Sequence, residues 1–143
     1  MPCIRDVMSD CAVTLSPDDT LIEAVRTLCA SHLSGAPVVD FEGNVVGFIS
    51  EPALMDVLFD ENARSAPVHD YMSPSVHVLE PNDAIANAAT MFTLYGVRRL
   101  PVVENGTLVG VVTRRDLLQY SLLGGEPIND PLVELIPALG EYA

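Results

Sequence analysis

The stretch that decides the fold is Pro101-Val102-Val103-Glu104-Asn105-Gly106-Thr107-Leu108-Val109-Gly110-Val111-Val112, in which two apolar runs flank an Asn-Gly pair. Asn and Gly accept the left-handed backbone of a two-residue hairpin turn, so this pattern predicts two antiparallel strands. Thr113-Arg114-Arg115-Asp116 follows at once and opens a segment that we expect to be helical as far as Leu123.

The same pattern occurs earlier in the chain, because the sequence is an internal duplication. At a shift of 64 residues the first copy matches the second at ten positions of the first half, namely Asp6, Met8, Ser9, Leu15, Pro17, Asp19, Ala24, Pro37, Val38 and Val39. A one-residue deletion then changes the shift to 63, which aligns Gly43, Val46, Gly47 and Leu54 with Gly106, Val109, Gly110 and Leu117. The agreement covers nearly the whole of both halves, so we look for one repeated structural unit.

Each copy predicts the order β-α-β-β-α. The first has a polar lead-in with Met8-Ser9, an extended stretch, a helix, a hairpin and a second helix, over Ala12–Leu15, Thr20–Ser31, Pro37–Ile49 and Glu51–Phe59. The second repeats this order over Val76–Leu79, Ala84–Tyr95, Pro101–Val112 and Arg114–Leu123.

Short sequence motifs add detail to this predicted order of elements. Ser16-Pro17-Asp18-Asp19, like Glu80-Pro81-Asn82-Asp83 in the second copy, is interpreted as a helix start, with carboxylates where the helix dipole favours them. Cys29 lies among apolar residues of the first helix, so we expect a buried thiol rather than a nucleophile. The linker Asp60–Pro67 is polar and shows no regular pattern.

These elements predict a mixed α/β (α+β) fold. We place one repeat at residues 1–62, the second at 63–123 and a looser tail at 124–143, where Leu132–Leu135 could form a helical turn. A unit of about 55 residues is too small to bury both faces of its sheet alone. We therefore expect the repeats to pack sheet to sheet, with pseudo-twofold symmetry.

Composition excludes several classes of partner. The chain has 143 residues, is 49% hydrophobic and carries a net charge of −13, and all seven of its basic residues are arginine. This negative charge disfavours binding to nucleic acid and to anionic membranes, because proteins bind both largely through Lys and Arg side chains. No signal peptide and no membrane span are visible, and three cysteines without CxxC spacing fit reduced thiols. We expect a cytoplasmic protein.

Signals for catalysis are missing from the sequence. His32, His69 and His77 are scattered, without the spacing of a metal site, and GxGxxG, GxxxxGK[ST] and GxSxG do not occur. The carboxylate pair Asp18-Asp19 is explained by helix capping. We expect no metal, no catalytic cofactor and no enzyme.

Met-Ser, then Pro-x-Asp before a helix, Pro-Val-Val-acidic, and Val-Gly followed by Thr-x-x-Asp resemble the cystathionine β-synthase (CBS) domain. Two copies resemble the tandem CBS pair, or Bateman module, over about residues 3–123, with no catalytic domain outside it. The resemblance implies a regulatory module that binds an adenine nucleotide (AMP, ADP or ATP) or, less favoured, S-adenosylmethionine between its repeats. It also implies a homodimer that relays ligand occupancy to an unknown regulated protein.

By this resemblance Asp116 and Thr113 bind the ribose, and the same residues could instead form only a capping box. Four arginines of the second repeat, Arg98, Arg99, Arg114 and Arg115, could supply a positive pocket for phosphate, or could pair with surface carboxylates. The first repeat would complete the cleft with Met8, Val13, Leu33, Ser34 and Gly35, of which Val13 and Leu33 would sandwich the adenine. Core packing is the alternative role of these two side chains.

The first repeat departs from the pattern, since Ser50-Glu51-Pro52-Ala53 puts alanine where the ribose-binding carboxylate belongs. A second cleft, formed by Ser50, Met72, Val76, Val97 and Arg98, would therefore lack its polar anchor. We predict one working site and one degenerate cleft. The alternative function is a ligand-free dimeric interaction or structural module, or an inactive subunit of a larger assembly.

Overall fold

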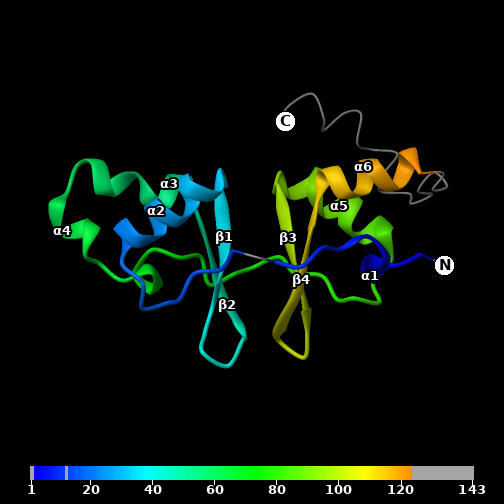
Figure 1. The fold of residues 1–143 in the computed structure, drawn as a ribbon, viewed down its shortest axis with the longest axis horizontal. Coiled ribbons are helices and arrows are strands. Elements are labelled where there is room, and N and C mark those ends of the chain that lie inside the picture. The colour runs from blue at the N-terminus through cyan, green and yellow to red at the C-terminus, as the bar shows by residue number, and fades with distance from the viewer. Residues whose placement is uncertain (1, 12, 124–143) are drawn as a thin grey trace. The chain divides into compact units, whose positions relative to one another are not determined.

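The structure is a computed structural model, and it describes residues 2–11 and 13–123. It divides the chain into two compact units. The first-repeat unit comprises Cys11–Val76 and Asn105–Leu108, and the second-repeat unit comprises Met1–Asp10, His77–Glu104 and Val109–Ala143. Each unit combines helices with strands (Figure 1), so the predicted mixed α+β content is confirmed. The tail at 124–143, with its possible turn at Leu132–Leu135, lies outside the described residues.

The first-repeat unit contains the predicted hairpin. Strands β1 (Gly35–Val39) and β2 (Val45–Ser50) are antiparallel, with Pro37 opposite Phe48 and an irregularity in the register between Val38 and Val39. Burial is nearly continuous along β1 and alternates along part of β2, which is the pattern of a hairpin with one face on a core.

The second hairpin is also as predicted. Strands β3 (Arg99–Glu104) and β4 (Thr107–Thr113) pair with each other, and the turn between them is Asn105-Gly106. Both turn residues have positive φ, 53° for Asn105 and 82° for Gly106. These are the left-handed conformations that a two-residue hairpin turn of this kind requires, and Asn and Gly adopt them at the lowest steric cost.

The long helices follow the predicted periodicity. Helix α2 (Leu21–Ser31) buries Leu21, Ala24 and Leu28, and α5 (Ile85–Tyr95) buries Ile85, Ala88 and Phe92. The prediction of a buried thiol at Cys29 is wrong, because that side chain is exposed. One residue beyond Leu28 the helix has turned by about 100°, away from the core.

The acidic segments before these helices form turns rather than the first helical turn. The Asp19 carboxylate accepts a hydrogen bond from the Ser16 backbone N–H at 2.9 Å, and Asp83 accepts one from Glu80 N–H at 2.8 Å. Helix α2 instead begins with a capping box, in which Thr20 and Glu23 each accept from the other's backbone N–H. The Thr-x-x-Glu signal for this cap is present in the sequence.

The second helices of the two repeats differ. Helix α6 (Arg114–Leu122) follows β4 as predicted, whereas the segment expected as one helix over Glu51–Phe59 divides into α3 (Glu51–Leu54) and the 3₁₀ helix η1 (Met55–Leu58). The linker is not irregular either. It contains α4 (Glu61–Arg64), with Ala63 buried, and is followed by the 3₁₀ helix η2 (Val68–Asp70).

Among the residues that the structure describes, each extended stretch before a long helix pairs with its hairpin at a single bridge. Leu15 forms a parallel bridge with Val38, and Leu79 forms one with Val102. Both leucines are buried. The first β element of each predicted β-α-β-β-α unit is thus a single bridge residue that anchors the chain to the core.

The lead-in of each repeat, which contains Met8-Ser9 or Met72-Ser73, packs on the hairpin of the other repeat. In the second-repeat unit the one-turn helix α1 (Ile4–Val7) buries Ile4 completely, and the Ile4 N–H donates to the Asp83 carbonyl at 2.9 Å. Ser9 bridges Val111 of β4 in the same unit, while Ser73 bridges Phe48 of β2 in the first-repeat unit. Each lead-in therefore extends the hairpin of the other repeat.

Glycine makes this approach possible at two equivalent positions. A Cβ on Gly110 would lie 2.9 Å from the Ser9 carbonyl oxygen, and one on Gly47 would lie 2.9 Å from that of Ser73. The side chains of Met8 and Met72 lie against the same two glycines. The Met-Ser and Val-Gly parts of the repeat are thus complementary surfaces of one contact.

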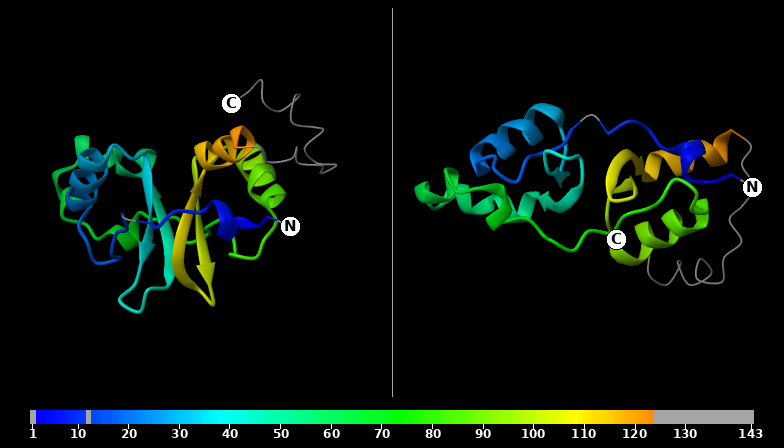
Figure 2. Two further views of the ribbon diagram at one scale, coloured as in Figure 1. Left: turned by 45° about the vertical axis from the view of Figure 1, so that its right-hand side comes forward. Right: turned by 90° about the horizontal axis from the view of Figure 1, so that it is seen from below.

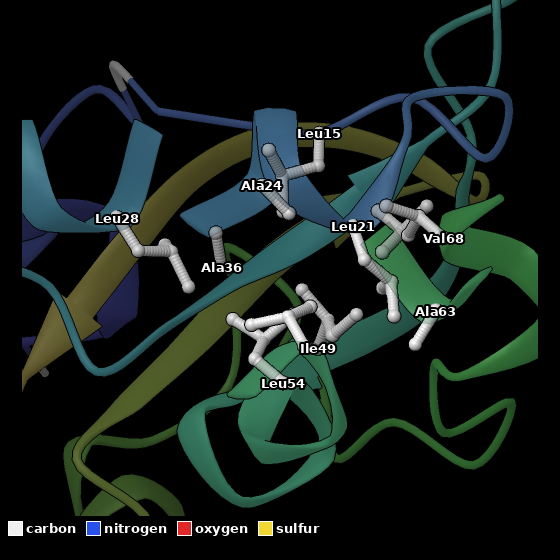
Figure 3. Close-up of a cluster of buried hydrophobic side chains, with 11 residues drawn as sticks. Leu15, Leu21, Ala24, Leu28, Ala36, Ile49, Leu54, Ala63 and Val68 are labelled. Carbon is white, nitrogen blue, oxygen red and sulfur yellow. The ribbon is translucent and has the colours of Figure 1, made fainter. Parts of the chain in front are cut away.

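Each unit has its own apolar core. Figure 3 shows the core of the first-repeat unit, where side chains from α2, β1, β2 and α4 converge with Leu15 and Val68. The core of the second-repeat unit gathers Ile4, Leu79, Ala88, Phe92, Leu100, Val102 and Val112. These cores fix the hairpins, and through them the starts of α3 and α6.

Candidate functional site

The start of α6 carries the two residues that the sequence analysis expects to bind ribose. Thr113 is the N-cap and Asp116 the third helical residue, and together they form a capping box. The Thr113 N–H donates to Asp116 Oδ2 at 2.8 Å, and the Asp116 N–H donates to Thr113 Oγ1 at 3.2 Å. The structural alternative considered for these residues is therefore present, and it leaves further hydrogen-bonding capacity on both side chains.

Asp116 is half-buried and held in one orientation by this box. Within the described part of the chain its Oδ1 atom has no hydrogen-bond partner, and an ionised carboxylate offers about four acceptor sites in all. The Thr113 hydroxyl accepts a bond and still has its own proton to donate. A pair of vicinal hydroxyls could thus bind here without disturbing the cap.

Arg114 is partly committed to the fold. Its Nε donates to the Val97 carbonyl at 3.1 Å and its Nη2 to the Gly96 carbonyl at 3.3 Å. Gly96 has positive φ and ends α5, so Arg114 ties the start of α6 to the end of α5. A cation at these carbonyls also complements the negative end of the helix dipole.

The other arginines of the second repeat are not engaged in this way. Arg98 and Arg115 are exposed and Arg99 is half-buried. Across residues 2–11 and 13–123 the only ion-pair contact within 4 Å joins His69 to Asp70, so the alternative of arginine–carboxylate pairs is not seen. Arg98, Arg99 and Arg115 keep their charge available for an anion.

Met8 belongs to the same unit as Thr113 and Asp116, and it lies half-buried on Gly110, three residues before the N-cap. The structure thus brings together, in the second-repeat unit, all the predicted site residues that the sequence assigned to α6 and to the Arg98-Arg99 pair, together with Met8.

The remaining predicted residues, Val13, Leu33, Ser34 and Gly35, lie in the first-repeat unit. Val13 and Leu33 are half-buried and pack against its core, which is the alternative role considered for them. The Ser34 carbonyl accepts from the Glu51 N–H at 2.9 Å. A Cβ on Gly35 would lie 2.8 Å from the Ile49 carbonyl oxygen, so glycine is needed for the close pairing of β1 and β2.

The predicted degenerate site lies at the start of α3, which lacks the capping box found at the start of α6. Ser50 is the N-cap but makes no side-chain capping bond, and Pro52 occupies the first turn. Met72 lies on Gly47, and Val76 is half-buried in the first-repeat unit, whereas Val97 and Arg98 belong to the second-repeat unit. Alanine at position 53 offers no carboxylate to any ligand.

Sequence reasoning missed a stacked pair of rings at the end of α5. The His77 and Tyr95 ring centroids are 4.0 Å apart, with an interplanar angle of 8°. Tyr95 directly precedes Gly96, whose carbonyl accepts from Arg114. The two residues are 18 positions apart with no shared motif, so the sequence carries no signal for their contact.

No group of three or more His, Cys, Asp or Glu side chains among the described residues could hold a metal ion. No helix in this part of the chain is long and apolar enough to cross a membrane.

Comparisons with known proteins identify the repeats. The CBS domain model matches the chain twice, at residues 4–60 and 68–123. The uncharacterized protein MJ1225 of Methanocaldococcus jannaschii is 31% identical over 123 residues, covering 86% of this chain and 43% of that protein. The A-adding tRNA nucleotidyltransferase of Aquifex aeolicus is 33% identical over 116 residues, covering 81% of this chain and 14% of the enzyme. The chain thus spans less than half of these relatives.

The comparison with solved structures also indicates a pair of CBS domains. The structure of CBSX2 in complex with AMP, a CBS-pair protein of Arabidopsis thaliana, matches with a TM-score of 0.76 and 27% identity, over 85% of this chain and 96% of that one. Two matches of the family model and this structural likeness lead to one conclusion: the chain belongs to the CBS domain family and contains two CBS domains in tandem.

Proposed function

We propose that this chain is a regulatory module that binds an adenosine-containing ligand, with Asp116 as the ribose anchor. The observation that carries the proposal is the half-buried Asp116 carboxylate, oriented by the capping box and with acceptor sites to spare. Because the carboxylate is already ordered, a ligand would not have to order it on binding. CBSX2, the similar protein, was solved with AMP.

The remaining predicted residues have secondary roles in this proposal. The Thr113 hydroxyl supports the same sugar, and Arg98, Arg99 and Arg115 favour a phosphate-bearing ligand such as AMP, ADP or ATP over S-adenosylmethionine. Arg114 contributes less, because two of its donors already bind carbonyls. Family resemblance supports Met8, Val13, Leu33, Ser34 and Gly35 as further contacts, and the missing carboxylate at Ala53 supports an empty second site.

Regulation would work through assembly. We propose a cytoplasmic homodimer without catalytic activity of its own, which passes ligand occupancy to a regulated protein. A ligand can shift such an equilibrium only if it binds two arrangements with different affinity. The alternative is a ligand-free dimeric interaction module with the same fold.

Thermal unfolding with AMP, ADP, ATP or S-adenosylmethionine tests the proposal. A ligand at about 100 times its dissociation constant stabilises the folded state by about 2.7 kcal/mol, which corresponds to roughly 5–10 °C for a chain of this size. Asp116→Asn keeps an oxygen for the Thr113 N–H but loses the charge. Since a hydrogen bond to a charged group contributes about 1.5–3 kcal/mol, we expect affinity to fall roughly 10- to 150-fold.

Glu23→Gln is the matched control, because Glu23 is the third residue of a helix in the same kind of capping box. It should leave the ligand-induced shift intact. Absence of a shift with all four compounds at millimolar concentration would instead favour the ligand-free module, and a full shift in Asp116→Asn would remove Asp116 from the site.

A further inference from the structure

The turn between β3 and β4 carries the only Asn-Gly pair of the sequence, and it forms the exposed tip of that hairpin (Figure 2). Within residues 2–11 and 13–123, neither the Asn105 side-chain amide nor the Gly106 N–H has a hydrogen-bond partner. Gly106 also has no Cβ that would shield its nitrogen. A side-chain carbonyl carbon and an accessible backbone nitrogen therefore follow each other in the chain.

These two groups can react with each other to form a cyclic imide. The Gly106 nitrogen loses its proton and forms a bond to Asn105 Cγ, while the Cγ–Nδ2 bond breaks and Nδ2 takes up a proton and leaves as ammonia. Water then opens the imide at either carbonyl. One product is aspartate, and the other is isoaspartate, in which the main chain runs through Cβ. Nothing is oxidised or reduced, and water is the only co-reactant.

Asn44, which lies opposite this turn, lacks both conditions for the reaction. Its Nδ2 donates to Glu42 Oε2 and its Oδ1 accepts from Thr107 Oγ1, each at 3.5 Å. The next residue is the β-branched Val45, whose N–H donates to the Gly106 carbonyl at 3.1 Å. At Asn44 the amide is engaged, and the nitrogen that would attack it is both bonded and shielded.

The other asparagines of the described chain are protected as well. The N–H that follows Asn62 belongs to Ala63 and donates to the Asp60 carbonyl at 3.1 Å. The N–H that follows Asn82 donates to the Glu80 carbonyl at 3.0 Å. Asn87 lies in α5 directly before a buried alanine, so ring closure there would require local unfolding of the helix.

A reaction at Asn105 would alter the backbone where two hairpin tips pair. Residues Asn105–Leu108 belong to the first-repeat unit, and there the Leu108 N–H donates to the Gly43 carbonyl at 3.0 Å in addition to the bond from Val45 to Gly106. The turn needs two successive residues with positive φ. Isoaspartate adds a main-chain atom, which this two-residue turn does not accommodate.

We propose that Asn105 is a site of spontaneous deamidation, and that isoaspartate formed there detaches the Gly106 carbonyl from the Val45 N–H. The reaction converts a neutral amide into a carboxylate and so adds one negative charge at the hairpin tip. This inference does not depend on ligand binding, so it can fail while the proposed function stands.

Peptide mapping of the folded protein tests the proposal. Because all seven basic residues are arginine, trypsin releases Asn105 in residues 100–114 with no other asparagine, whereas Asn44 is released in residues 27–64. After incubation in mildly alkaline buffer, deamidation in residues 100–114 should be at least roughly tenfold faster, equivalent to about 1.4 kcal/mol of activation free energy. Equal rates in the two peptides would overturn the proposal, and so would a reaction seen only after unfolding in urea.

Two variants separate the loss of the amide from its consequence for the fold. Asn105→Gly keeps a residue that accepts positive φ but has no amide, so it should give no product. Asn105→Asp, freshly prepared, adds the same charge without lengthening the main chain, and its Val45 amide should exchange as in the fresh protein. In the isoaspartate form the Val45 amide should exchange at least roughly tenfold faster. Unchanged exchange in that form would overturn the proposed detachment.

Discussion

The two repeats form the same hairpin and then start the next helix in different ways. After β4, Thr113 and Asp116 satisfy each other's backbone N–H groups, and α6 continues for nine residues. After β2, Ser50 makes no side-chain capping bond, and α3 ends after four residues. The hairpin is set by turn chemistry and burial, which both repeats share, whereas a capping box at the helix start also needs a polar side chain at the third helical position, which is Asp116 in the second repeat and Ala53 in the first.

We propose that this difference has a functional counterpart. At the helix start the second repeat has the oriented carboxylate of Asp116 and the exposed Arg115, while the first repeat has Glu51, Pro52 and Ala53. On this proposal, the duplicated fold keeps its architecture in both halves and a ligand-binding polar site in only one. Two pairs of matched variants and one single variant test this contrast between the repeats.

The largest effect is expected where the repeats are alike. Gly110→Ala and Gly47→Ala would each place a Cβ 2.9 Å from a lead-in carbonyl oxygen, which a well-packed contact cannot accommodate without movement. We expect both variants to lose about 1–3 kcal/mol of unfolding free energy, measured by urea denaturation. A loss in only one of them would show that the exchange of lead-ins supports the two units unequally.

An intermediate effect is expected at the two capping boxes. Thr113→Ala and Thr20→Ala each remove a side-chain acceptor from a helix N-terminus, so both should cost about 1 kcal/mol in urea denaturation. Only Thr113→Ala should also weaken nucleotide binding in a titration. Equal affinities of the two variants for the ligand would mean that the Thr113 hydroxyl has no role beyond the cap.

The smallest effect is expected at Ser50, the N-cap of α3. Its side chain makes no capping hydrogen bond, so Ser50→Ala should change the unfolding free energy by less than about 0.5 kcal/mol. Urea denaturation beside Thr113→Ala measures the contrast directly. A loss as large as that of Thr113→Ala would contradict the difference between the two helix starts.

Much of the fold could be predicted because its signals are local. The turn at Asn105-Gly106, the apolar face of α2 and the cap of α6 each depend on residues within a few positions of one another. The predictions that failed concern features that depend on contacts between residues far apart in the sequence. Cys29 was predicted to be buried because its sequence neighbours are apolar, but its side chain is exposed. The linker helix α4 is anchored by the burial of Ala63, which could not be predicted from a segment that is otherwise polar.

The candidate site divides in the same manner. The sequence indicated Thr113 and Asp116 and their capping geometry, since all the atoms involved lie within four residues. It did not indicate that Arg114 binds the Gly96 and Val97 carbonyls or that His77 stacks on Tyr95, because these contacts join residues 17 or 18 positions apart.

The sequence alone was enough to predict the duplication, the two hairpins, the long helices and the absence of the carboxylate in the first repeat. The packing of each lead-in on the hairpin of the other repeat, with Ser9 on Val111 and Ser73 on Phe48, is visible only in the folded chain. Turns and caps are satisfied by adjacent residues, whereas Ile4 is buried, and Met8 and Met72 are half-buried, by surfaces that exist only once the hairpins have formed.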